Sequence, residues 1–327
     1  MGSRVVQALV GAGGWGYFPG GLPGYARAFA FAEVNASFYR EIPEAQARRW
    51  RAAAPEGFTF AVKASRDVTH RDGLRASPAG RSSFAHAIRL AGILRAPYVI
   101  LQTPASLRIG ERELSGLRDL LGLADPSVRL GLEARAHRNG RLPPGLRSLM
   151  EDAGILDVVD LSRGRPRVNE ADVYSRLFGP GPANVYEFDD DELRGIDRAG
   201  CDAVRVAFTF HGVRMHKDAA RFLTFRRTGE FPSATRATGV ASLEEVLRPD
   251  ARFPASRDAL ARDHGWKVID LDPRTRAHAE RLLERLPART FEDLEAVARA
   301  LAAGGFSRSH DGRRTWPTWR KSPPVRL

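Results

Sequence analysis

Cysteine is almost absent from this sequence, in which Cys201 is the single cysteine among 327 residues. One cysteine excludes an internal disulfide and any zinc site built from several cysteines. This usage is typical of a reducing compartment, so we expect a cytoplasmic protein with Cys201 as a small buried side chain. Methionine is also scarce, while arginine is abundant. Both thermophilic proteins and GC-rich genomes produce that bias.

Long apolar runs are absent too. No stretch approaches the roughly 18 consecutive apolar residues that cross a bilayer, although 43% of the residues are hydrophobic. We therefore predict no membrane segment. The apolar run at residues 5–10 leads into a glycine-rich loop without a signal-type cleavage site, so we expect it to be a first strand.

Positive charge is in excess, with a formal net charge of +12 and a pI of about 10.6. A positive potential attracts polyanions, which makes nucleic acid the first expected partner. The alternative is that the arginines only place solvated charge on the outer faces of helices. The sequence carries no signal for the oligomeric state.

Eight short apolar runs alternate with amphipathic segments through about residue 225. Each run suits a buried strand, and eight strand–helix units close most economically as a TIM-type (β/α)8 barrel. The runs are residues 5–10, 32–35, 59–63, 98–102, 129–133, 157–160, 173–177 and 203–210. The expected helices are residues 44–54, 81–94, 111–121, 144–152 and 190–199.

The composition of the sequence changes after the eighth run, where Arg-rich segments are interrupted by prolines. We therefore predict three parts: a barrel (1–228), a small all-helical domain (229–305) and a basic tail (306–327). Helices are expected at 243–247, 256–264, 274–285 and 291–303. Ser256 and Thr290 are the expected N-caps of the second and fourth.

The tail interleaves cations with two indoles. It has six basic side chains against one acidic side chain, for a net charge of +5. Cations can meet phosphates while indoles stack on bases, so the tail is predicted to bind nucleic acid. The residues concerned are Arg313, Arg314, Trp316, Trp319, Arg320 and Lys321. The alternative is that the tryptophans dock the tail on the protein's own surface.

Polar side chains stand at or near the carboxyl end of most predicted strands. In a TIM barrel the active site is assembled at that end, so we expect these side chains to converge. They are Glu33, Asn35, Lys63, Gln102, Glu133, Arg135, Asp160, Arg176 and His211.

Four residues are candidates for catalysis. Glu33 and Glu133 could share acid and base work or bind a metal, unless each only pairs with a cation. Lys63 ends an apolar strand, where desolvation would make it an anion anchor or a Schiff-base nucleophile. His70, in the loop after that strand, supplies a titratable imidazole.

The remaining candidates would bind substrate. Arginines can clamp a carboxylate or phosphate, amides can hydrogen-bond hydroxyls, and aromatic rings can form a stacking wall. These residues are Trp15, Asn35, Tyr39, Gln102, Arg135, Arg176 and His211. The glycine run at 11–16 is no dinucleotide fingerprint, because an aromatic segment follows it in place of a helix. A divalent metal at the barrel mouth stays open, as the cofactor is unknown.

Several ordered motifs resemble a known family. Residues 11–17 (GAGGWGY), 31–39 (FAEVNASFY) and 60–63 (FAVK) lead the series, followed by 69–70 (TH), 101–106 (LQTPAS), 132–135 (LEAR), 160–162 (DLS) and 174–179 (YSRLFG). Together they resemble the YecE-like family, domain of unknown function 72, over about residues 5–225. The resemblance implies a TIM-type barrel that has been likened to endonuclease IV and xylose isomerase. The family usually has a histidine at the position of Phe178 and a pair of asparagines at the positions of His211 and Gly212. This sequence departs from the family at both places.

Residues 253–260 (FPASRDAL) and 283–291 (LERLPARTF) resemble domain of unknown function 2795, a small helical module. On charge, tail and fold analogy we favour a nucleic-acid-directed hydrolase or lyase that acts on damaged DNA. One alternative is an enzyme for a phosphorylated or polyhydroxylated small molecule. Another is a non-catalytic nucleic-acid-binding or scaffold protein.

Overall fold

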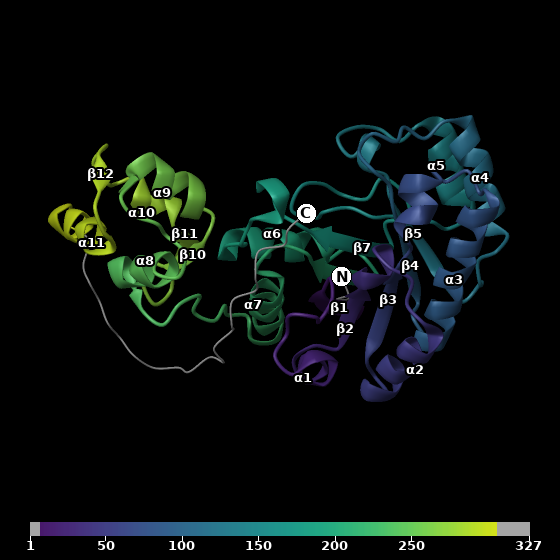
Figure 1. The fold of residues 1–327 in the computed structure, drawn as a ribbon, viewed down its shortest axis with the longest axis horizontal. Helices are drawn as coiled ribbons and strands as arrows, with labels where there is room; N and C mark the ends of the chain where they lie inside the picture. The colour runs from purple at the N-terminus through teal and green to yellow at the C-terminus, as the bar shows by residue number, and fades with distance from the viewer. Residues whose placement is uncertain (1–6, 306–327) are drawn as a thin grey trace. The chain divides into compact units, whose positions relative to one another are not determined.

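The computed structural model describes residues 7–305, which form two compact units (Figure 1). The first unit is Met1–Leu177 with Ile196–His211, and the second is Phe178–Gly195 with Gly212–Leu327. The chain therefore enters the second unit twice. Only residues 7–305 of these ranges are described below. The predicted division after residues 228 and 305 stays a prediction.

Eight parallel strands form the sheet of the first unit, as the sequence predicted. In chain order they are β1 (Gln7–Ala12), β2 (Phe31–Val34), β3 (Thr59–Lys63), β4 (Tyr98–Gln102), β5 (Arg129–Glu133), β6 (Leu156–Asp157), β7 (Asp172–Leu177) and β8 (Arg205–Phe210). Their order in the sheet is β6-β5-β4-β3-β2-β1-β8-β7, and a parallel bridge between Val159 and Ser175 brings its two edges together. The fold is a TIM-type (β/α)8 barrel.

Helices separate most of these strands. They are α1 (Gly21–Ala28), α2 (Glu44–Ala53), α3 (Pro78–Leu94), α4 (Glu111–Leu121), α5 (Pro144–Asp152) and α6 (Asp190–Gly200). Helix α7 (Met215–Thr228) follows β8 and belongs to the second unit. Ser77 begins α3 by accepting a hydrogen bond from Gly80 N, and Pro78 has no N–H to leave unpaired. The sequence analysis missed α1, which begins with glycine, and α7.

The link from β6 to β7 is held by side chains, because its described residues contain no helix. Arg167 binds Asp157 through Nε at 2.7 Å and Nη2 at 2.7 Å. Asn169 donates from Nδ2 to the carbonyls of Met150 at 2.9 Å and Ile155 at 2.8 Å. Hydrogen bonds therefore hold this link, whereas a helix connects the strands in the other repeats of the barrel.

The C-terminal part of the second unit contains helices α8 (Gly239–Leu247), α9 (Arg257–His264), α10 (Glu280–Leu283) and α11 (Leu294–Ala303). It also has two antiparallel pairs, β9 (Ala255–Ser256) with β12 (Thr290–Phe291) and β10 (Val268–Asp270) with β11 (Arg276–His278). Leucines and valines of all four helices form one apolar core, together with Ile269 and Phe291. The expectation of an all-helical domain was therefore wrong in this respect.

Two local predictions fail for reasons that the turns explain. The helix expected at 274–285 is replaced by β11 and the short α10, because Asp272 Oδ1 accepts from Arg274 N and Thr275 N and so turns the chain into a hairpin. Thr290 lies in β12, and Asp293 caps α11 in its place. The predicted cap at Ser256 is confirmed by its bond from Ala259 N at 3.2 Å.

Two expectations from composition can be compared with the structure. Cys201 is exposed, not buried, because it follows the end of α6 on the surface, where its thiol donates to Arg198 O. Over residues 7–305, no helix is both long and apolar enough to span a bilayer.

Candidate active site

A layer of polar side chains lies above an apolar floor inside the barrel. The floor includes Phe31, Ala61, Ile100, Tyr174 and Ala207. Successive side chains of a strand point to opposite faces, so the residues two positions after the floor residues also point into the barrel. They lie one level nearer to the carboxyl ends of the strands. These residues are Glu33, Lys63, Gln102, Arg176 and Thr209, with Glu133 from β5, and all are buried.

Arg176 lies between the two glutamates at the centre of this layer. Its Nε and Nη2 donate to Glu33 at 3.1 and 3.0 Å, and its Nη1 donates to Glu133 Oε2 at 2.6 Å. The side chain of Arg176 is only 2% exposed. Burial lowers the pKa of Arg176, but the two carboxylates raise it above its ordinary value, so it stays a cation.

Glu33 has two further partners. Tyr174 donates its hydroxyl to Glu33 Oε2 at 3.0 Å, and His211 Nε2 lies 3.6 Å from Oε1. Burial acts to raise the pKa of Glu33, but Arg176, His211 and Lys63 lower it well below its usual range. Burial and the charge of Arg176 lower the pKa of His211 to about 4, so this imidazole is neutral near pH 7.

Glu133 is held by amide and guanidinium groups. Gln102 Nε2 donates to its Oε2 at 2.7 Å, while Arg135 and Arg138 reach Oε1 at 2.9 and 3.3 Å. Burial opposes ionisation, but Arg176 and Arg135 lower the pKa of Glu133 to about 2. Both glutamates are therefore anions at neutral pH and hold no proton to donate as general acids.

Lys63 occupies the edge of this layer and is only 3% exposed. Its Nζ donates to Asn35 Oδ1 at 3.2 Å and lies 3.6 Å from the centre of the Phe38 ring. Burial and the charge of Arg176 lower the pKa of Lys63 to about 6, although Glu33 and Glu133 act in the opposite direction. A large fraction of this amine is thus uncharged at neutral pH.

Tyr39 and His70 stand beside Lys63 at the surface. Both rings meet the edge of Phe38 with centroids 5.0 Å apart, and the Tyr39 ring lies 5.9 Å from Lys63 Nζ. The Tyr39 side chain is 63% exposed. Burial and the charge of Lys63 lower the pKa of His70 below its usual value. The two rings offer a platform next to the amine.

Two candidate residues lie apart from this layer. Trp15 packs edge-on against Trp50 of α2 and Phe60 of β3. Phe60 points to the outside of the barrel, because it alternates along β3 with the side chains that point inside. Asp160 accepts from Ser162 N and Oγ in a tight turn after β6. These contacts suit packing and turn formation. The predicted tail residues, 313–321, lie outside the described chain.

The sequence analysis missed Tyr174 and Arg138. Tyr174 could have been found from its position two residues before Arg176 on the same strand. Arg138 gave no signal among so many arginines. It also missed the role of Gly13, where a Cβ atom would lie 2.3 Å from His211 Nδ1. This glycine leaves the space that the imidazole fills.

Comparison with known proteins bears on the family. A model described as a protein of unknown function, DUF72, matches residues 19–228. The chain belongs to the DUF72 family. A comparison with curated proteins gives no match. Residues 252–301 lie beyond the DUF72 match, and their resemblance to domain of unknown function 2795 stays a prediction.

Solved DUF72 structures share the fold. A protein from Enterococcus faecalis has 16% identity over 68% of this chain and 98% of its own, with a TM-score of 0.57. One from Thermotoga maritima has 17% identity over 68% and 99%, with a TM-score of 0.53. Endonuclease IV from Thermus thermophilus has a TM-score of 0.43 at 16% identity over 68% and 97% of the two chains, a likeness too weak to bear on function.

Proposed function

We propose that this DUF72 protein is an imine-forming lyase for a phosphate-bearing sugar aldehyde, with Lys63 as the nucleophile and abasic nucleic acid as the substrate. The observation that carries this proposal is the Lys63 amine, buried at the carboxyl end of β3 and with its pKa lowered to about 6. An amine must be uncharged to attack a carbonyl carbon, and desolvation is a common way to achieve this.

The reaction can be written in balanced steps. The Lys63 nitrogen attacks the aldehyde carbon, a C–N bond forms, and the carbonyl oxygen leaves as water. The iminium group then draws electrons from the neighbouring carbon, which loses a proton to water, while the C–O bond on the next carbon breaks and the phosphate departs with the bonding electrons. Water finally hydrolyses the imine and restores the amine.

The surroundings of Lys63 suit an anionic substrate. Arg135 and Arg138 follow β5 with side chains 29% and 40% exposed, so their guanidinium groups reach the surface beside Glu133. Guanidinium groups bind phosphate through paired N–H donors. The net charge of +12 adds a longer-range attraction for nucleic acid. Tyr39 and His70 could stack on a base next to the abasic sugar.

The hydrolase alternative has less support. A hydrolase would use Glu33 or Glu133 as an acid, a base or a metal ligand, yet both carboxylates are bound by arginine. A small phosphorylated carbonyl compound would suit the same amine and arginines, so it is the second candidate. In that case Lys63 would perform the same first step.

Borohydride trapping tests the proposal directly. The full chain would be incubated with an oligonucleotide carrying one abasic site, reduced with borohydride, and digested for peptide mapping. We expect a covalent adduct on Lys63 that Lys63→Met abolishes and Lys217→Met retains. An adduct of equal yield in Lys63→Met would overturn the assignment. Trapping of a phosphorylated sugar aldehyde without trapping of the oligonucleotide would favour the small-molecule substrate.

A further inference from the structure

Four electron-pair donors meet in the second unit, three of them from the segment between β7 and β8 and the fourth from β11. His278 Nε2 lies 3.1 Å from Glu192 Oε2, 3.2 Å from the Tyr186 hydroxyl and 3.8 Å from Asp189 Oδ2. Tyr186 also donates its hydroxyl to Glu192. All four side chains are partly buried. We call these four residues the Asp-Glu-His-Tyr cluster.

Local structure fixes the two carboxylates. Asp189 and Glu192 form a capping box at the start of α6, in which Glu192 N donates to Asp189 Oδ1 at 3.0 Å and Asp189 N donates to Glu192 Oε2 at 2.9 Å. The capping bonds use Oδ1 of Asp189. Its Oδ2 is the atom turned toward the imidazole.

The backbone fixes the imidazole from its other side. His278 Nδ1 lies 3.1 Å from Trp266 O, so the proton of a neutral ring resides on Nδ1. Nε2 then presents a lone pair to two carboxylates and to a hydroxyl oxygen whose proton goes to Glu192. A metal ion in this position would accept lone pairs from the imidazole nitrogen and from both carboxylates at once. A proton on Nε2 can reach one or two of them.

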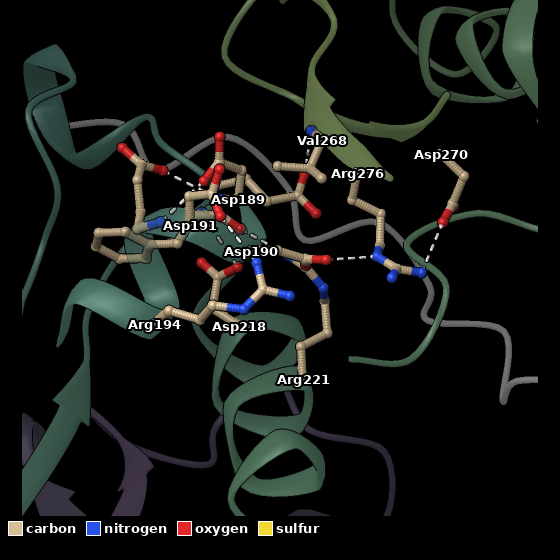
Figure 2. A network of polar contacts seen from close by, with 12 residues as sticks. Asp189, Asp190, Asp191, Arg194, Asp218, Arg221, Val268, Asp270 and Arg276 are labelled. Atoms are coloured by element: carbon tan, nitrogen blue, oxygen red, sulfur yellow. Dashed lines mark hydrogen bonds and ion pairs between the residues drawn. The ribbon is translucent and has the colours of Figure 1, made fainter. Parts of the chain in front are cut away.

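Ion pairs hold the supporting elements together (Figure 2). Asp190, next to Asp189, accepts from Arg221 of α7 at 2.5 Å and from Arg276 of β11 at 2.7 Å. Arg276 precedes His278 by two residues in the same strand. This bridge keeps β11 and the start of α6 in register, so the donor atoms are positioned before any ligand arrives.

We propose that Asp189, Glu192 and His278 bind one divalent transition-metal ion, with Tyr186 beside it. One imidazole nitrogen with carboxylate oxygens is a donor set that Zn²⁺ accepts, at ligand distances of about 2.0–2.2 Å. Ligand atoms around such an ion are roughly 3.3–3.6 Å apart, and the observed separations of 3.1 and 3.8 Å lie close to this range. The Trp266 carbonyl acts as the outer partner that orients a metal-bound histidine.

The ion would tie β11 to the start of α6. We therefore assign it a stabilising role in the second unit, independent of the imine chemistry proposed for Lys63. Because metal binding to a folded chain stabilises that chain, added Zn²⁺ should raise the melting temperature.

Zn²⁺ titration of the chelator-treated full chain tests the site. Competition with a chromogenic chelator should give one site with a Kd below about 10 µM, and His278→Gln should weaken it at least about tenfold, since a ligand is lost. His264→Gln is the matched control, because His264 also faces a carboxylate, with Nδ1 3.6 Å from Asp250. It should leave the affinity unchanged. Equal affinity in wild type and His278→Gln, or no binding at 100 µM Zn²⁺, would overturn the proposal.

A second measurement uses the unaltered chain in case His278→Gln does not fold. Diethylpyrocarbonate modifies accessible imidazole nitrogens, and peptide mapping reports each histidine separately. Zn²⁺ should protect His278 from modification while leaving the rate at His264 unchanged. Equal modification of His278 with and without Zn²⁺ would show that the imidazole binds no ion.

Discussion

Arg176 binds both carboxylate oxygens of Glu33 inside the barrel, where its Nε and Nη2 donate hydrogen bonds of 3.1 and 3.0 Å. The pair is almost fully buried, and Arg176 also neutralises Glu133. Removing one partner of such a pair leaves an uncompensated charge in a poorly solvated place. The arginine therefore supports the fold as well as the electrostatics around Lys63.

Arg176→Met should lower the free energy of unfolding by about 3–5 kcal/mol, because two buried carboxylates lose their cation. Urea unfolding measures the change. Arg147→Met is the control, since the Arg147–Glu151 pair on α5 is exposed at 43% and 48% and should contribute less than about 1 kcal/mol. Equal losses in the two variants would contradict the structural role of Arg176.

The reactivity of Lys63 should depend on pH in an unusual window. Only the uncharged amine attacks a carbonyl, so its rate should rise with pH through a midpoint of about 6 and level off above pH 7. The chain has four lysines, Lys63, Lys217, Lys267 and Lys321, so reductive methylation can be read for each by mass spectrometry. A midpoint near 10 for Lys63 would show an ordinary surface lysine.

Lys63→Met should stabilise the protein while abolishing imine formation. The pKa of Lys63 is about 6 in the folded chain and about 10.4 when unfolded. At pH values between these two, the unfolded state binds more protons than the folded state. Lys63 therefore lowers the free energy of unfolding most at low pH, and this loss becomes smaller as the pH rises. The variant should have a melting temperature higher by about 2 °C or more at pH 7. It should also lack part of the wild-type rise in stability from pH 7 to 9. A lower melting temperature would argue for a structural lysine.

Gly13→Ala should displace His211, since the added Cβ would lie 2.3 Å from Nδ1 of the ring. Overpacking of this kind costs about 1–3 kcal/mol. Gly16→Ala is the matched change in the same loop, where a Cβ meets nothing within 4 Å. Thermal melting of both variants tests the contrast. A Gly13→Ala protein as stable as Gly16→Ala would show that the loop gives way easily.

Deletion of residues 306–327 tests the predicted nucleic-acid element. Each phosphate contact that is lost should reduce the slope of log K against log salt by about 0.7–0.9. Trp316→Ala and Trp319→Ala should each weaken binding by about 1–3 kcal/mol if both indoles stack on bases. Titration with a labelled oligonucleotide measures both effects. Equal affinity and slope with and without the tail would remove it from the interface.

The barrel could be predicted because its signal is local. The runs ending at Lys63, Gln102 and Glu133 match β3, β4 and β5 residue for residue, since each is a short apolar stretch that closes on a polar side chain. The contacts among these ends could not be predicted. Arg176 binds a glutamate 143 positions away, and no sequence period reports such a pair.

The second unit was harder to predict for the same reason. His278 meets Glu192 across 86 positions, and the strand that carries it was taken for a helix. A turn set by Asp272 decided between the two, against a helical pattern of apolar residues. Side-chain hydrogen bonds to the backbone outweighed periodicity there.

The helix-free link between β6 and β7 makes one seam of the barrel different in kind from the others. Elsewhere a strand is backed by an apolar helix face, whereas here closure depends on the bridge at Val159 and Ser175 and on charged bonds from Arg167 to Asp157. Because Asp157 is fully buried and Arg167 is only 18% exposed, added salt should screen this pair little. We expect amide exchange of the barrel to begin at this link, since no helix covers it.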